Sequence, residues 1–107
     1  MKTRPFATGL VLLAASGAAW SAALDLPLTD PVIWSNAGTV IRVSMPNIVN
    51  NWACTDPDSY FVQSTLSQQV QSRILAVLLT AKALGRPVTV RLDGCESNRP
   101  AITAAFF

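Results

Sequence analysis

Residues 65–92, which read TLSQQVQSRILAVLLTAKALGRPVTVRL, hold the strongest structural signal in the chain. Apolar residues recur in the first part at helical spacing and predict a helix that ends at Leu84. Ser64 or Thr65 can cap its first turn, and Gly85 suits the left-handed position that follows a last turn. The sequence therefore predicts one long helix over about 65–84.

The predicted helix has two apolar sides. At about 100° per residue, most apolar residues fall in one arc about 120° wide, which we expect to face the core. These residues are Leu66, Val70, Ile74, Val77, Leu78, Ala81 and Leu84. Leu75 and Leu79 project from nearly the opposite side, and they are interpreted either as an ordinary surface feature or as a contact in an oligomer.

Extended segments are predicted on both sides of the helix. The clearest follows Pro87, which cannot continue a helix, and alternates inward Val88, Val90 and Leu92 with outward Thr89 and Arg91. A turn at Asp93-Gly94 and a loop then lead to a terminal strand at 101–107, whose two final phenylalanines are expected to be packed.

The segments before the helix predict further strands. A first strand is expected at 38–45, a loop or a short second strand at 49–54, and a short extended piece at 59–62. Residues 24–36 contain two prolines, so they are expected along an edge of the domain rather than inside a sheet. Strands, one long helix and further strands together predict a single α+β domain over 24–107, with a small, curved, mostly antiparallel sheet.

The N-terminus has the order of a secretory signal. Lys2 and Arg4 precede a mostly apolar run over 6–19, and small residues follow it. Cleavage is expected after Ser21 or Ala23, and we favour Ala23, which makes 1–23 a signal peptide. An uncleaved anchor is the alternative, but the run is shorter than the about 20 apolar residues that span a bilayer.

The two cysteines are expected to form a disulfide. A domain this small buries a modest share of its surface, so a covalent link is useful. In an oxidising compartment, Cys54 and Cys95 are far more often bonded to each other than catalytic or metal-binding. The expected location is therefore secreted or periplasmic.

Composition argues against several functions. Removal of Lys2 and Arg4 leaves six basic and six acidic residues, so the mature domain carries no basic surface for nucleic acid. The chain has no histidine, which leaves a zinc site short of ligands and a Ser-His-Asp or Cys-His arrangement impossible. Asp56 and Asp58 are interpreted as turn residues rather than a hydrolytic pair. We expect no enzymatic activity, cofactor or metal.

The sequence resembles a known family. Residues 74–90, with Gly85-Arg86-Pro87-Val88 and then Asp93-Gly94-Cys95, and Gly38-Thr39-Val40-Ile41 resemble the subtilase-cytotoxin B-subunit-like proteins. The resemblance covers about 37–107. It implies a small exported barrel of the oligonucleotide/oligosaccharide-binding (OB) type, with the long helix between the early and late strands. Toxin members form pentamers, bind sialylated glycans and carry an enzymatic A subunit, so the resemblance implies these partners.

One position departs from the glycan-binding members of that family. They have a serine before the glycine that opens the first strand, and this chain has Ala37. Loss of that hydroxyl argues against sialic-acid binding by the same contact, because an unmatched buried polar partner costs about 1–3 kcal/mol. Trp34, Asn36 and Trp52 are the candidate ligand-binding residues, although both tryptophans can instead cover the barrel ends.

Two functions are therefore expected. The first is a non-enzymatic exported binding module that resembles toxin B subunits and recognises a carbohydrate or a cell-surface partner. The alternative is a monomeric periplasmic accessory protein that keeps the fold without the glycan site.

Overall fold

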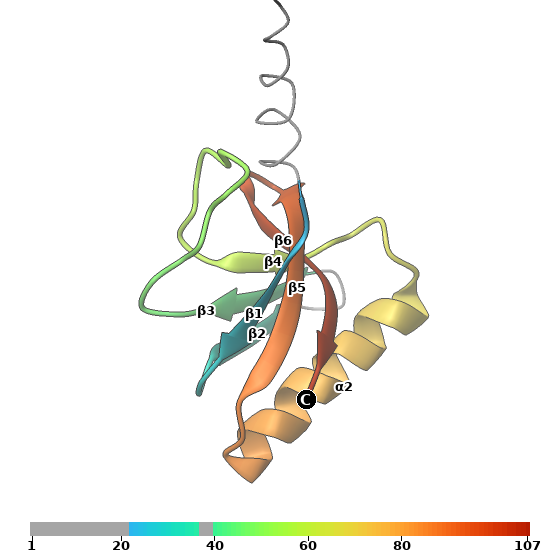
Figure 1. Ribbon diagram of the computed structural model, residues 1–107. Coiled ribbons are helices and arrows are strands. Elements are labelled where there is room, and N and C mark those ends of the chain that lie inside the picture. Colours follow the sequence, from blue (N-terminus) through green and yellow to red (C-terminus); the bar gives the residue numbers. More distant parts are fainter. Residues whose placement is uncertain (1–21, 37–39) are drawn as a thin grey trace, which may run out of the picture.

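A computed structural model describes residues 22–36 and 40–107 (Figure 1). The predicted signal peptide, apart from Ala22 and Ala23, lies outside the described residues, and so do Ala37 and Gly38. Among the described residues, one helix lies between four early and two late strands, so the α+β prediction is confirmed. The elements are β1 (Leu24–Leu28), β2 (Val32–Asn36), β3 (Val40–Ser44), β4 (Tyr60–Val62), α2 (Gln68–Leu84), β5 (Val88–Glu96) and β6 (Arg99–Phe106).

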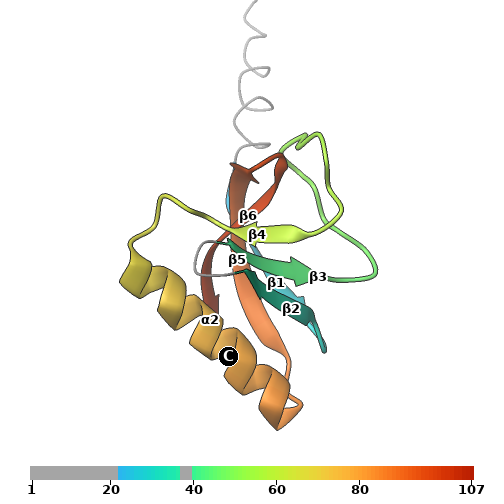
Figure 2. The same cartoon turned by 180° about the vertical axis from the view of Figure 1, so that it is seen from behind.

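The strands form one mixed sheet in the order β1-β5-β6-β4-β3-β2. Four neighbouring pairs are antiparallel, and β4 and β6 are parallel. A parallel pair needs a long crossover, and α2 lies within the chain that connects β4 to the late strands. Figures 1 and 2 show α2 running along one side of the sheet from both views.

The two edge strands of the sheet are consecutive in the chain. Residues 24–36, expected at an edge, form β1 at one end of the sheet and β2 at the other. Only residues 29–31 join them, so the Cα atoms of Leu28 and Val32 are at most about 14 Å apart. A flat sheet of this many strands is about 24 Å wide. The sheet must therefore be strongly curved, although no hydrogen-bonded pairing between β1 and β2 closes it.

The helix begins later than predicted. Its N-cap is Ser67, whose hydroxyl accepts a hydrogen bond from the backbone N–H of Val70 at 3.2 Å. Ser64 and Thr65 do not cap it, because the chain first makes a turn in which the N–H of Leu66 donates to the carbonyl of Gln63. The predicted end is confirmed. Gly85 follows in the left-handed conformation and donates to the carbonyls of Ala81 and Lys82.

The middle of α2 packs as predicted and its ends do not. Ile74, Leu78 and Ala81 are buried against the sheet. Val70 and Leu84 were placed in the same arc but are exposed, because the two ends of the helix extend past the strands (Figure 2). The remaining core comes from inward strand residues and includes Val43, Tyr60, Val88, Val90, Leu92 and Ile102. The predicted inward set of β5 is thus confirmed.

The predicted turn at Asp93-Gly94 is wrong. Both residues lie inside β5, where Gly94 has a φ of 75° and the register with β6 shifts between Leu92 and Cys95. Such a shift at a left-handed glycine is a β-bulge. The chain reverses at Ser97 and Asn98, both with positive φ, as a two-residue type I′ hairpin requires.

The C-terminus is ordered but not packed as expected. β6 extends to Phe106, yet the side chains of Phe106 and Phe107 are 42% and 53% exposed. They lie beside cations instead of inside the core. The Arg91 guanidinium is 5.9 Å from the ring centre of Phe106, and that of Arg86 is 5.6 Å from Phe107.

The predicted disulfide is present. Cys54 and Cys95 are bonded, with their Cα atoms 5.8 Å apart. The bond ties the long connection between β3 and β4 to the bulged part of β5. The same connection is held by Tyr60, whose buried hydroxyl accepts a hydrogen bond from Val49 N–H at 2.8 Å. Within residues 22–36 and 40–107, no helix has the length and apolar character needed to cross a membrane.

Candidate functional site

Three neighbouring strands carry an aromatic residue, a cation and a second aromatic residue side by side. Trp34 of β2 is opposite Arg42 of β3, and Arg42 is opposite Phe61 of β4. Tyr60 and Val62 point into the core, so Phe61 between them points outward. Trp34 is 58% exposed. We call these three residues the aromatic row.

The aromatic row lines a hollow on the outer surface. Its volume is about 390 Å³, and Ser35 and Val40 complete its lining. Small-molecule sites have volumes of about 300–1,000 Å³, so this hollow lies in the range of a small ligand. It offers an indole face and a guanidinium. These are groups that can stack on a ring and donate to oxygen atoms.

A cluster of ion pairs holds Arg42 in place. Its Nη2 lies 3.2 Å from Asp58 Oδ2, and its Nε donates to Ser59 Oγ at 2.9 Å. Arg99 donates to Asp58 from the other side and also pairs with Asp56, each at 2.9 Å. Both guanidinium groups also lie over the Phe61 ring, with that of Arg42 at 5.6 Å and that of Arg99 at 4.8 Å from the ring centre.

The cluster has two consequences for function. Its two arginines and two aspartates balance in charge, so the aromatic row presents an oriented donor without an excess of positive charge. Asp56 and Asp58 both engage Arg99, and the Asp58 N–H donates to the Asp56 carbonyl at 2.9 Å. The two carboxylates therefore serve to position arginines in this structure.

Acid is expected to weaken this cluster. Hydrogen bonds from Arg99 and Ser59 lower the pKa of Asp58 from 3.8 to about 2. The folded state thus favours the carboxylate, and its stabilising contribution, complete above pH 3.8, is lost as the pH falls toward 2. We expect the melting temperature of the wild type to fall more steeply over this interval than that of Asp58→Asn, as followed by circular dichroism.

Asp93→Asn is the control for this experiment, because it removes a carboxylate from an exposed position on β5 outside the cluster. Its melting temperature should fall with pH as steeply as that of the wild type, whereas that of Asp58→Asn should fall less steeply. If the melting temperatures of Asp58→Asn and the wild type fall in parallel as the pH is lowered, the cluster does not contribute to the loss of stability in acid.

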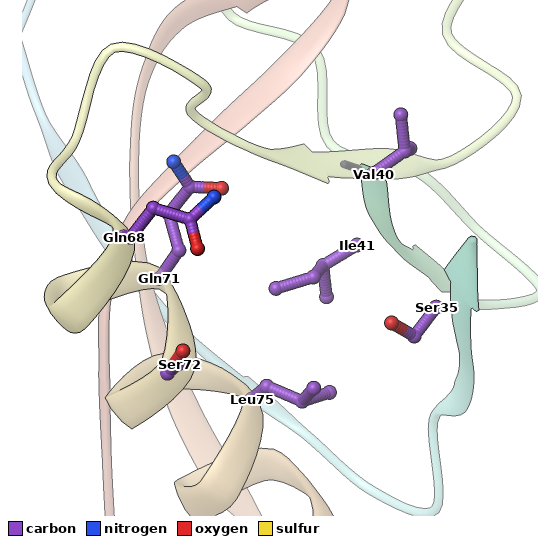
Figure 3. Close-up of a pocket in the computed structure, with 7 residues that line it drawn as sticks. All are labelled: Ser35, Val40, Ile41, Gln68, Gln71, Ser72 and Leu75. Atoms are coloured by element: carbon purple, nitrogen blue, oxygen red, sulfur yellow. The ribbon is translucent and has the colours of Figure 1, made fainter. Parts of the chain in front are cut away.

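A second, smaller hollow lies between α2 and the β2–β3 pair. Its volume is about 130 Å³. Figure 3 shows Gln68, Gln71, Ser72 and Leu75 on the helix side, and Ser35, Val40 and Ile41 on the sheet side. Ser35 and Val40 line both hollows, so the two are neighbours. All seven lining residues are uncharged.

The other predicted site residues lie in different places. Asn36 ends β2, opposite Val40. Trp52 is half-buried and packs against the core, and its carbonyl oxygen is 3.8 Å from Cys95 Sγ beside the disulfide. It lines neither hollow, and its Nε1 has no hydrogen-bond partner among the described residues. The structure therefore does not join Trp52 to Trp34 in one platform.

The two leucines proposed for an oligomer contact also differ. Leu79 is 49% exposed, as expected. Leu75 is half-buried, packs against the core and lines the smaller hollow, so its predicted outward position is wrong. The sheet curves around the helix far enough to cover the side on which Leu75 lies.

The sequence prediction missed the partners of Trp34. Alternation along β3 is a signal that could have placed Arg42 on the same face as Val40, but nothing in the sequence indicated that β4 would lie beside it. That pairing brings Phe61 next to Arg42. Comparison with known proteins adds no assignment, because no family model, curated protein or solved structure matches the chain.

Proposed function

We propose that the chain is an exported, non-enzymatic binding module that recognises carbohydrate at the aromatic row. The observation that carries the proposal is the exposed face of Trp34 beside a hollow that also presents Arg42. An indole face packs against the C–H side of a sugar ring, and donors beside it bind ring hydroxyls. The neutral balance of the adjacent cluster disfavours a polyanion.

The topology supports an OB-like barrel as the scaffold. If β1 and β2 are counted as one bent strand, the sheet has five strands and its first strand lies at both ends. The helix then falls between the third and fourth strands. OB folds are five-stranded, partly open barrels that bind oligosaccharides or oligonucleotides on the face of strands two and three. In this count, Arg42 and Phe61 belong to strands two and three.

Export is supported by two features of the chain. Disulfides persist mainly in oxidising compartments, and the Cys54–Cys95 bond closes much of the domain. The charged and then apolar order of the first residues is that of a secretory signal. Both features support a secreted or periplasmic location.

The proposal is tested with Trp34→Ala. We expect binding on a glycan array, and the heat released on isothermal titration with the bound glycan, to be lost in this variant and largely kept in Trp34→Phe, which retains an aromatic face. Val32→Ala is the matched control, because Val32 is also exposed on β2 but lines neither hollow.

If Trp34→Ala still binds the glycan, the binding site does not lie at the aromatic row. A wild-type protein that binds no glycan would favour the alternative, a monomeric periplasmic accessory protein with the same fold. Ala37, in place of the family serine, motivates that alternative. Assembly into a pentamer with an A subunit stays a proposal from the family resemblance, and Leu79 is the exposed one of the two leucines predicted to contact another subunit.

A further inference from the structure

The smaller hollow is too small to be a complete ligand site. Its volume of about 130 Å³ is below the about 300–1,000 Å³ of small-molecule sites, so it can hold a substituent rather than a whole sugar. It shares Ser35 and Val40 with the larger hollow. A ligand stacked on Trp34 can therefore place one of its substituents there.

The lining of the smaller hollow has two kinds of surface. Ile41 and Leu75 supply aliphatic carbon from the sheet and the helix, and Val40 lies at the rim with its side chain turned away, as Figure 3 shows. Gln68 and Ser72 supply an amide and a hydroxyl from exposed helix positions, as Figure 3 shows. A substituent that fits must combine a small apolar part with groups that both donate and accept hydrogen bonds.

Gln71 supplies an oriented acceptor. Its Nε2 donates to the carbonyls of Ser64 and Leu66, at 3.2 and 2.8 Å. These bonds hold the amide in one orientation, and the atom that it can offer a ligand is Oε1. A ligand N–H is the natural partner for this oxygen, whereas a ligand carbonyl would pair with the Ser72 hydroxyl or the Gln68 amide.

We propose that the smaller hollow selects the acetamido group of an N-acetylhexosamine whose ring stacks on Trp34. An acetamido group carries one methyl, one N–H and one carbonyl, which match the aliphatic side, Gln71 Oε1 and the donors of Ser72 and Gln68. A charged substituent finds no counter-charge among the seven residues that line this hollow. This inference rests on the proposed carbohydrate function and specifies its substrate class.

Paired sugars test the selection. Isothermal titration with N-acetylglucosamine against glucose, and N-acetylgalactosamine against galactose, compares ligands that differ only at the 2-substituent. We expect the acetamido sugar to bind at least about tenfold more tightly than its plain partner in at least one of the two pairs. Ser72→Met, which fills the hollow from an exposed helix position, should abolish this preference and leave the weaker binding of the plain sugar.

Ala76→Met is the matched control, because Ala76 is exposed on α2 and lines neither hollow. Gln68→Ala is a second variant and should reduce the preference without filling space. Equal affinities within both pairs, with binding still lost in Trp34→Ala, would overturn the acetamido site and keep the carbohydrate function. Binding restricted to sialylated glycans would also overturn it. No binding to any of these sugars would overturn both proposals.

Discussion

Removal of the disulfide should destabilise the domain by about 4 kcal/mol. The bond joins residues 41 positions apart, and the chain-entropy relation gives this value for a loop of that length. At about 4–8 °C per kcal/mol for a domain of this size, the melting temperature should fall by roughly 15–30 °C. The double variant Cys54→Ala/Cys95→Ala, compared with the oxidised wild type by thermal and urea unfolding, measures the effect.

Reductant provides the control for this comparison. It should lower the stability of the wild type toward that of the double variant and leave the double variant unchanged. A double variant within about 1 kcal/mol of the oxidised wild type would contradict the expectation. The connection between β3 and β4 would then be held by its other contacts, such as the hydrogen bond from Val49 to Tyr60.

Leu78→Ala should cost about 2–5 kcal/mol of unfolding free energy. Leu78 is completely buried where α2 meets the sheet, and truncation of such a leucine loses both the burial and the packing around it. The neighbouring Leu79→Ala removes the same atoms from a side chain that is 49% exposed and should change stability by no more than about 0.5 kcal/mol. Urea denaturation of both variants gives the two values.

The contrast between these adjacent leucines is the test of how α2 sits on the sheet. A loss of similar size in both variants would indicate that the exposed side of the helix is covered in solution, and self-association of the wild type would then be the first property to measure. A small loss at Leu78 would show that the helix is not docked as described.

The sequence predicted those features that depend on local chemistry. Gly85 after the helix and the alternation of Val88, Val90 and Leu92 are set by a few adjacent residues, and both were predicted correctly. The disulfide was predictable because the chain has only two cysteines.

Features that depend on distant pairing were predicted less well. Asp93-Gly94 has the composition of a turn, but its pairing with β6 makes it a bulge, and the turn moves to Ser97-Asn98. Helical periodicity places Leu75 on the side of α2 that faces away from most of its apolar residues, but the curved sheet covers that side as well. The aromatic row was missed for the same reason, because Trp34, Arg42 and Phe61 meet only through strand pairing.

The first strand segment also constrains when the domain can fold. β1 pairs with β5, so Leu24 at the start of the domain is opposite Leu92 near its end. A chain that emerges from a ribosome or a translocation channel N-terminus first must wait for nearly its full length before this pairing can form. Contacts over such separations slow folding. A nascent chain with residues 88–96 still inside the ribosome would therefore lack β5, so β1 would have no partner and the sheet would be incomplete.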